Sequence, residues 1–416
     1  MNQYDYDAIV VGGGAAGLMC AGTAARRGLR VLLCEQGPRP ARKVRITGKG
    51  RCNVTNDCGP DELLRRVRTN PRFLYSAAYA WPPAETMAFF EGLGVPLKTE
   101  RGARVFPQSD QAADIANALT DWALEKNVTL AQEHCTRLLT RDGALCGVAC
   151  RSGRSWRAPA AVLATGGKSY PATGSDGSGY RLAQQAGHTI VPPRPSLIPL
   201  ETAEDWCREV TGLSLRNVTL TLRRAGEKKP VYSELGEMLF THFGISGPLV
   251  LTASSYMKDC AGFSITIDLK PGLSEQQLDA RLLRDFSEYS NREFHNALGD
   301  LLPQSLIPVI VRLSGIGGET KVNQITRDQR AALCGLLKAL PVTPVAFRPI
   351  EEAIVTAGGV DVREIDPRTM QSKKLPGLYF AGEVMDVDAT TGGFNLQIAF
   401  ATGRLAGQSL CAAGQE

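Results

Sequence analysis

The chain has 416 residues, of which 43% are hydrophobic and 21% charged, and its net charge is +5. This composition excludes global disorder, and so mild a charge does not by itself indicate a nucleic-acid partner. No apolar run approaches the roughly 18 residues of a membrane helix, and the polar start MNQYDYD predicts no signal peptide. Eleven cysteines without a CxxC pair predict reduced thiols in a cytoplasmic protein, without a metal site.

The first 35 residues predict a β-α-β unit. Residues 7–11 have the pattern of a buried strand, residues 15–27 that of an alanine-rich helix, and residues 29–34 that of a second strand. A G-x-G-x-x-G motif lies between the first strand and the helix, at Gly12, Gly14 and Gly17. In such a unit the first glycine permits a tight turn, the second admits a pyrophosphate, and the third lets the helix pack closely on the strand.

Glu35 closes the second strand, 18 residues after Gly17. Its carboxylate can accept hydrogen bonds from the 2′-hydroxyl of a ribose and would repel a 2′-phosphate, which argues against NADP at this site. The free amides at the start of the intervening helix favour phosphates. Strand, glycine motif, helix, second strand and acid all occur in register, so we predict a dinucleotide site.

Residues 128–164 are expected to form a meander of short strands. The last of these, residues 160–164, runs into the sequence T-G-G at 165–167. Such strand ends are where open α/β sheets bind ligands, and a helix is predicted after them over 176–187. The proline-rich residues 191–200 are expected to be a stiff connector that leaves the first domain.

Residues 200–345 have a different character. Residues 218–222 and 263–269 alternate like antiparallel strands, and helices are predicted over 274–290 and 326–340, each opening with an S/T-x-x-Q capping box. Prolines follow the second helix, so this segment reads as a domain inserted into the first one. The predicted domains are 1–192, 193–345 and 346–416.

The C-terminal region returns to glycine-rich α/β character. Residues 377–382 predict a strand that ends in Gly382-Glu383, and TTGG at 390–393 precedes an amphipathic helix over 394–410. A helix that starts with glycines and threonines has free amides at its N-terminus. Those amides can stabilise negative charge on a ring such as a reduced flavin.

These glycine-tipped elements resemble the FAD-binding half of two-domain flavoproteins, and more closely the BaiN-like and aminoacetone-oxidase-like family of FAD-dependent oxidoreductases. The last matching stretch is also similar, more distantly, to succinate dehydrogenase and fumarate reductase flavoproteins. The resemblance implies an α/β fold: a Rossmann-like, two-part FAD-binding domain of the glutathione-reductase/fumarate-reductase kind, with an inserted β-rich domain plus helices. The matching stretches lie at 11–19, 48–56, 104–109, 164–180, 241–248, 355–360 and 377–407.

FAD is the cofactor that the resemblance implies. The glycine motif would hold the pyrophosphate, Glu35 the adenosine ribose, the 48–56 loop the flavin side, and residues 392–396 the pyrimidine edge of the flavin. The expected cofactor-binding residues are Gly12, Gly14, Ala15, Ala16, Gly17, Glu35, Gln36, Lys43, Gly48, Gly50, Arg51, Cys52, Asn53, Thr165, Gly166, Gly167, Gly382, Glu383, Gly392, Gly393, Asn395 and Leu396.

A basic run over 39–51 leads directly from the strand that Glu35 closes. A solvated loop and a role near FAD phosphates or an anionic substrate are equally weighted interpretations, with Lys43 and Arg51 preferred because they match the family stretches. Cys52 and Cys58 have the spacing C-x5-C, whereas disulfide reductases use C-x4-C. We therefore interpret them as ordinary reduced cysteines.

His242, in THFGISGP, is the candidate catalytic residue, a proton donor facing the flavin, although a lone histidine is more often structural. Residues 150–345 do not repeat the strand–glycine–helix–acid pattern, so no separate nicotinamide domain is predicted. NAD(P)H would then dock transiently at the flavin, or the substrate itself would be the electron donor.

The main prediction is an FAD-dependent oxidoreductase that exchanges a hydride between flavin N5 and a small organic substrate. Small molecules are the expected partners, with neither a membrane nor, as first preference, nucleic acid. Two alternatives stay open. The basic run, extended by Arg65, Arg66 and Arg68, suggests a flavoenzyme that modifies RNA, and the missing nicotinamide domain suggests a non-catalytic FAD sensor.

Overall fold

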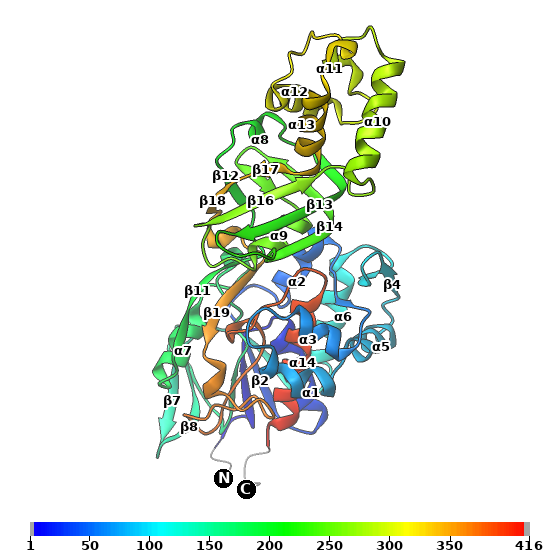
Figure 1. The fold of residues 1–416 in the computed structure, drawn as a ribbon. Helices are drawn as coiled ribbons and strands as arrows, with labels where there is room; N and C mark the ends of the chain where they lie inside the picture. Colours follow the sequence, from blue (N-terminus) through cyan, green and yellow to red (C-terminus); the bar gives the residue numbers. More distant parts are fainter. Residues whose placement is uncertain (1–3, 412–416) are drawn as a thin grey trace. The chain divides into compact units, whose positions relative to one another are not determined.

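The computed structural model describes residues 4–411, which divide into two compact units (Figure 1). The first unit comprises residues 4–196 and 349–411, and the second comprises residues 197–348. The second unit is therefore an insertion in the sequence of the first, and its ends lie a few residues beyond the expected 192/193 and 345/346. No helix among the described residues is both long and apolar enough to cross a bilayer.

The first unit is built on a five-stranded parallel sheet with the order β20-β10-β1-β2-β6. Its first four strands in that order are completely buried, as the apolar runs in the sequence predict for a parallel sheet covered on both faces. The strands are β1 (Ala8–Val11), β2 (Val31–Glu35), β6 (Val128–Gln132), β10 (Ala161–Leu163) and β20 (Leu378–Phe380).

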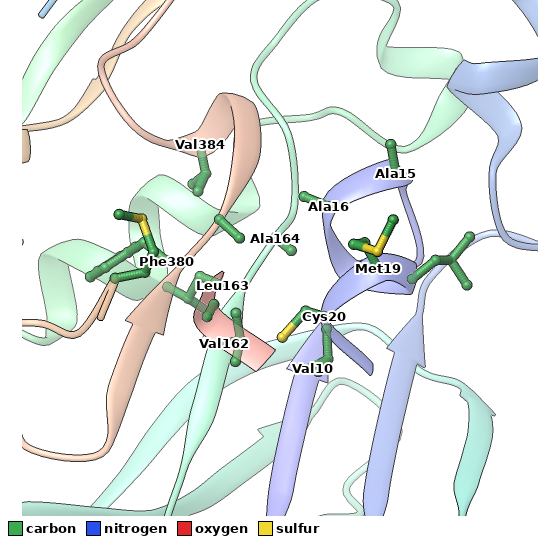
Figure 2. Packing of buried hydrophobic residues seen from close by; sticks show 14 of the residues in the cluster. Val10, Ala15, Ala16, Met19, Cys20, Val162, Leu163, Ala164, Phe380 and Val384 are labelled. Atoms are coloured by element: carbon green, nitrogen blue, oxygen red, sulfur yellow. The ribbon is translucent and has the colours of Figure 1, made fainter. Parts of the chain in front are cut away.

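Two long helices of the first unit, α1 (Ala15–Arg26) and α14 (Phe394–Ser409), pack directly on each other. Their approach depends on glycine, because a Cβ on Gly403 of α14 would lie 2.3 Å from the carbonyl oxygen of Ala16. Small side chains also fill the space beside α1, where Ala16 and Ala164 belong to one apolar cluster with Val384 (Figure 2). Helices from the two ends of the chain are thereby brought together.

One prediction for residues 128–164 is wrong in part. Residues 128–132 form β6, which pairs in parallel with β2 through Val31↔Val128, and so they extend the main sheet. Only the later strands form an antiparallel meander: β7 (Cys135–Arg141), β8 (Ala144–Cys150) and β9 (Ser155–Arg157). A short strand carries no local mark of its partner, so the sequence alone could not separate β6 from the meander.

The predicted proline-rich connector is also wrong. Ile190–Ser196 form strand β11, which pairs antiparallel with β19 (Val355–Val360) and belongs to the first unit. The pairing shifts between Val191 and Arg194, which places Pro192 and Pro193 at the irregularity. Proline has no N–H to donate, so an irregular position tolerates it where a regular ladder would not.

The remaining elements of the first unit surround the sheet. A small antiparallel sheet has the order β3-β5-β4, with β3 (Thr55–Asn56), β4 (Leu97–Glu100) and β5 (Arg104–Pro107). The other helices are α2 (Arg42–Ile46), α3 (Pro60–Arg66), α4 (Tyr75–Ala80), α5 (Pro83–Gly92), α6 (Ala112–Leu124) and α7 (Ser178–Gln185).

The second unit contains a seven-stranded antiparallel sheet with the order β17-β16-β13-β14-β15-β12-β18, and its own apolar core. Its strands are β12 (Leu200–Thr202), β13 (Ser214–Arg224), β14 (Tyr232–Thr241), β15 (Gly244–Ser246), β16 (Phe263–Asp268), β17 (Leu340–Val342) and β18 (Pro344–Phe347). Its helices are α8 (Trp206–Glu209), α9 (Pro248–Ser254), α10 (Glu275–Glu288), α11 (Phe294–Ala297), α12 (Ile307–Ser314) and α13 (Arg327–Lys338). Both predicted capping boxes are confirmed, at Ser274 and Thr326. The β-rich insertion with helices is confirmed as well.

Candidate functional site

The start of α1 is shaped by three glycines with different surroundings. Gly12 has φ +105°, and a Cβ there would lie 2.6 Å from the carbonyl oxygen of Ala164. A Cβ on Gly17 would lie 1.9 Å from the carbonyl oxygen of Gly12. A Cβ on Gly14 would meet nothing within 4 Å, and no side chain caps the helix there. Gly12 and Gly17 are therefore required by packing, whereas Gly14 borders open space at uncapped helix amides, where an anion can bind.

Glu35 lies buried beside this helix start, at the end of β2. One carboxylate oxygen accepts the N–H of Gly13 at 2.8 Å, and the other accepts the N–H of Gly37 at 2.6 Å. Each oxygen still has a lone pair for a hydroxyl donor, which suits a ribose. The next residue, Gln36, donates to the carbonyl of Gly174 at 2.6 Å and so fastens the segment after β10 over this end of the sheet.

The predicted flavin-side loop, 48–53, has an unusual backbone. Gly48, Lys49, Gly50 and Cys52 all have positive φ, between +58° and +85°. Non-glycine residues in this region are strained, and such strain persists where the surrounding structure holds a functional shape. The Cys52 side chain is buried, and burial raises the pKa of its thiol to about 12, so it stays protonated.

This loop is hydrogen-bonded to the start of α14. Asn56 donates to the carbonyl of Gly392 at 3.0 Å, and the Asn53 amide, oriented to satisfy its neighbours, accepts the N–H of Gly393 at 3.0 Å. A Cβ on Gly393 would lie 2.3 Å from the carbonyl oxygen of Thr55. Gly393 has φ +95° and no side chain caps the helix that follows, so α14 too begins with free amides.

A polar network joins the other predicted turns. The ammonium of Lys43 lies 2.7 Å from a carboxylate oxygen of Glu383 and 2.7 Å from the hydroxyl of Ser169. The other Glu383 oxygen accepts the N–H of Thr356 at 2.8 Å and the hydroxyl of Ser169 at 3.1 Å. This network connects α2, the turn after β10, β19 and the turn after β20. Lys43 and Glu383 therefore fix these turns to one another.

Other predicted residues have partners within the protein. The guanidinium of Arg51 contacts Glu100 and Asp110, so two carboxylates balance its charge. The Asn395 side chain accepts the N–H of Ala389 at 3.0 Å and donates to its carbonyl at 2.9 Å. These two side chains hold neighbouring segments in place. Contacts of Arg51 and Asn395 with FAD are therefore predicted for their backbone atoms.

Of the remaining predicted positions, Thr165 has a buried hydroxyl without a hydrogen-bond partner, and Gly166 and Gly167 follow it. A Cβ on Gly167 would lie 2.4 Å from the hydroxyl oxygen of Thr356. Ala15, Ala16, Gly382 and Leu396 lie in the helix starts and turns already described. His242 is exposed and lies in the β14–β15 turn of the second unit, with its ring edge-to-face against Phe243.

Sequence reasoning missed two buried acids just before the TTGG turn. Asp386 accepts hydrogen bonds from Asn70 and from the N–H of Gly358, both at 3.1 Å, and burial raises the pKa of its carboxyl. Asp388 accepts the hydroxyls of Thr69 at 2.5 Å and Ser196 at 2.7 Å. The signal was present in the sequence as D-V-D, one residue before a predicted ligand turn. Only the fold showed that both acids are buried.

The predicted residues fit an FAD. An extended dinucleotide needs a free helix start for its pyrophosphate, an acid for its ribose and free amides for its ring. The first unit offers Gly14 at α1, Glu35, the unpartnered Thr165 hydroxyl and the uncapped Gly393 at α14. Among the described residues, no group of His, Cys, Asp and Glu is arranged to hold a metal ion.

Comparison with known proteins places the chain in a family. Residues 6–409 match the HI0933-like protein Rossmann domain family. The chain is 33% identical to a ribosomal RNA dihydrouridine synthase from Escherichia coli K12 over 98% of both chains. It is 30% identical to a 3-dehydro-bile acid delta(4,6)-reductase from Clostridium scindens, covering 96% of this chain and 98% of the relative.

Solved structures support the fold. The 3-ketosteroid-delta4-(5alpha)-dehydrogenase of Rhodococcus jostii RHA1 is similar, with a TM-score of 0.51 and 16% identity over 99% of this chain and 98% of that one. At this identity the likeness concerns the fold alone. The family match and the two relatives carry the assignment further. The chain belongs to the HI0933-like family of FAD-dependent oxidoreductases, with a Rossmann-like fold.

Proposed function

We propose that this protein reduces uridine to dihydrouridine in RNA, with FAD as its cofactor and NAD(P)H as the electron donor. The observation that carries this proposal is the 33% identity to a ribosomal RNA dihydrouridine synthase along 98% of both chains. It favours the RNA alternative of the sequence analysis over the small organic substrate. Work on RNA also agrees with a cytoplasmic protein whose eleven cysteines are all unpaired.

Exposed charges in the basic run after β2 support an anionic substrate. Arg39 and Lys49 lie in the basic run, both side chains are exposed, and neither forms an ion pair with a described residue. Cations that lack carboxylate partners are available to phosphates, whose contacts dominate the affinity of proteins for nucleic acids. Two further cations of the run, Lys43 and Arg51, already have carboxylate partners.

Saturation of the uracil C5=C6 bond needs a hydride at C6 and a proton at C5, so that uridine, NAD(P)H and a proton become dihydrouridine and NAD(P)⁺. FAD, when bound, supplies the hydride. The protein contributes orientation and electrostatics: the amides at the start of α14 favour negative charge, and the Lys43–Glu383–Ser169 network keeps the turns in place. His242 is our proposed proton donor.

Purified protein, FAD and NAD(P)H should produce dihydrouridine in ribosomal RNA that lacks it, measured by mass spectrometry of the digested nucleosides. If NAD(P)H reduces the bound flavin but no dihydrouridine forms, the RNA proposal is overturned. The second candidate is reduction of a steroid enone, suggested by the 30% identical bile acid reductase. The same preparation assayed with an unsaturated 3-ketosteroid distinguishes the two.

His242→Gln tests the proton donor. We expect flavin reduction by NAD(P)H to remain and product formation to slow by about 100-fold or more. His295→Gln is the matched control, because His295 is another exposed histidine of the second unit. Equal rates in both variants would exclude His242 as the donor.

A further inference from the structure

Two tyrosines on the short helix α4 are unusually exposed. Tyr75 and Tyr79 are 51% and 52% exposed, and their rings lie nearly parallel, with an interplanar angle of 5° and centroids 6.1 Å apart. They are one helical turn apart, so both project from the same side of the helix. Large aromatic side chains are usually buried, and an exposed parallel pair offers flat faces on which bases can stack.

Arginines precede this pair in the chain. Four of the eight residues from 65 to 72 are arginine. Arg72 is exposed and forms no ion pair with a described residue, and Arg65 has a 75% exposed side chain whose partner, Glu62, lies 3.3 Å away and also binds Arg66. Exposed ion pairs of this kind contribute little stability, so a phosphate can replace Glu62 at little cost.

The two acids in the first turn of α3 are both engaged. Asp61 accepts the hydroxyl of Tyr79 at 2.6 Å, and Glu62 is shared between two arginines. The bond to Asp61 restrains the Tyr79 ring, and its exposed fraction remains about half. The surface therefore combines oriented rings with cations, which is the combination that binds single-stranded RNA.

This surface is attached to the proposed flavin turn by backbone hydrogen bonds. Val67 and Ala389 form an antiparallel bridge. The N–H of Arg68 donates to the carbonyl of Asp388 at 2.7 Å, and the N–H of Thr390 donates to the carbonyl of Arg66 at 3.0 Å. Residues 391–393 follow immediately and lead into α14. These bonds join the segment before the two tyrosines to the turn that precedes α14.

We propose that Tyr75, Tyr79, Arg65 and Arg72 form a platform for single-stranded RNA beside the reaction site. Bases of nucleotides flanking the target uridine stack on the two rings, and the guanidinium groups bind the intervening phosphates. The platform rests on the proposed function and adds to it the class of substrate, an unpaired RNA segment rather than a free nucleoside or a duplex.

The test uses the full-length holoenzyme and a fluorescent single-stranded fragment of ribosomal RNA. Tyr75→Ala combined with Tyr79→Ala should raise the Kd at least about fivefold, as expected for loss of one stacked base, and lower dihydrouridine formation at limiting RNA. Flavin content and flavin reduction by NAD(P)H should not change. Tyr79→Phe, which keeps the ring and loses the bond to Asp61, should bind like the wild type.

Arg72→Gln should lower the slope of log Kd against log salt by about one. Arg216→Gln is its matched control, because Arg216 is an exposed arginine of the second unit and the same charge is removed. An unchanged Kd in the double tyrosine variant overturns the platform even if the wild type forms dihydrouridine. RNA binding that depends on the rings, without dihydrouridine, supports the platform and overturns the proposed function. Wild-type protein that does neither overturns both.

Discussion

Two long helices of the second unit begin differently from the two long helices that pack together in the first unit. In the second unit, α10 and α13 start at Ser274 and Thr326, whose hydroxyls accept amide hydrogens in complete capping boxes. In the first unit, α1 and α14 start at Gly14 and Gly393, and no side chain caps either of them. The first amides of any helix need partners. Side chains satisfy these amides in α10 and α13, which stabilises the helices. The amides of α1 and α14 have no such partner, and we propose that a ligand binds them.

Buried charge shows the same contrast. Among the described residues, Asp285 is the only carboxylate buried in the second unit, whereas the first unit buries several. That set is Asp7, Glu35, Glu133, Asp361, Asp386 and Asp388. Burying a carboxylate is unfavourable unless donors surround it. In the first unit, buried carboxylates such as Glu35 and Asp386 hold turns in one conformation. Substitutions in these turns should therefore weaken cofactor binding as well as lower stability.

The largest effect is expected from a single methyl group at Gly17. Gly17→Ala places its Cβ 1.9 Å from the carbonyl oxygen of Gly12. The backbone must move to relieve this clash. We expect a loss of about 3 kcal/mol or more in the free energy of unfolding, together with loss of FAD. Gly335→Ala in α13 meets nothing within 4 Å and should stabilise by about 0.5–1 kcal/mol. Urea denaturation and flavin content measure both, and similar behaviour of the two variants would contradict the contrast.

The next effect concerns two comparable ion pairs. Lys43 lies 2.7 Å from Glu383 in the first unit, and Lys338 lies 2.6 Å from Asp268 in the second, each pair about one-fifth exposed. Replacing either lysine by methionine leaves a carboxylate without its partner and should lower stability by about 1–3 kcal/mol. Only Lys43→Met should also weaken FAD binding, because it releases the turn of Glu383. Calorimetric titration with FAD checks this, and equal affinities would argue against the network's role.

Adding a cap to α1 and removing one from α10 should have smaller effects. The two substitutions should change the free energy of unfolding in opposite directions. Gly14 has φ −81° and open space around its Cβ, so Gly14→Ser fits the backbone and caps α1. We expect stability of the FAD-free protein to be kept or raised by up to about 1 kcal/mol, and FAD affinity to fall about 10-fold. Ser274→Ala should lower stability by about 1 kcal/mol and leave FAD affinity as it is. Unaltered FAD affinity in Gly14→Ser would remove α1 from the proposed site.

The smallest effect is a dependence of stability on pH. His188 of the first unit is buried between Glu364 and Ser372, and burial lowers its pKa below the usual 6.5 although Glu364 opposes the shift. Below about pH 6.5 the unfolded chain binds a proton that the folded chain does not, so stability should decrease as pH falls. His188→Gln should flatten this slope in urea denaturation between about pH 7.5 and 5.5. Burial also lowers the pKa of His134, so part of the pH dependence should remain in this variant. A slope identical to that of the wild type would exclude a contribution from His188.

Local patterns predicted the elements that local forces control. The β-α-β start, both capping boxes and the final helix depend on residues a few positions apart, and the structure confirms them. The β6 and β11 strands were misassigned, because their roles depend on distant partners, Val31–Glu35 for β6 and Val355–Val360 for β11. Arg51 shows the same limit at the site, since the sequence could not reveal that Glu100 and Asp110 balance its charge.

The sequence by itself determined that a glycine motif, an acid and two later glycine turns exist, because each is a short pattern with its own chemistry. The tertiary structure alone decided that these turns meet. Gly403 of α14 packs on Ala16 of α1, Asn56 holds Gly392, and Lys43 binds Glu383 across 340 positions of the chain. Such contacts depend on how the whole chain closes on itself, and no short stretch of residues encodes that.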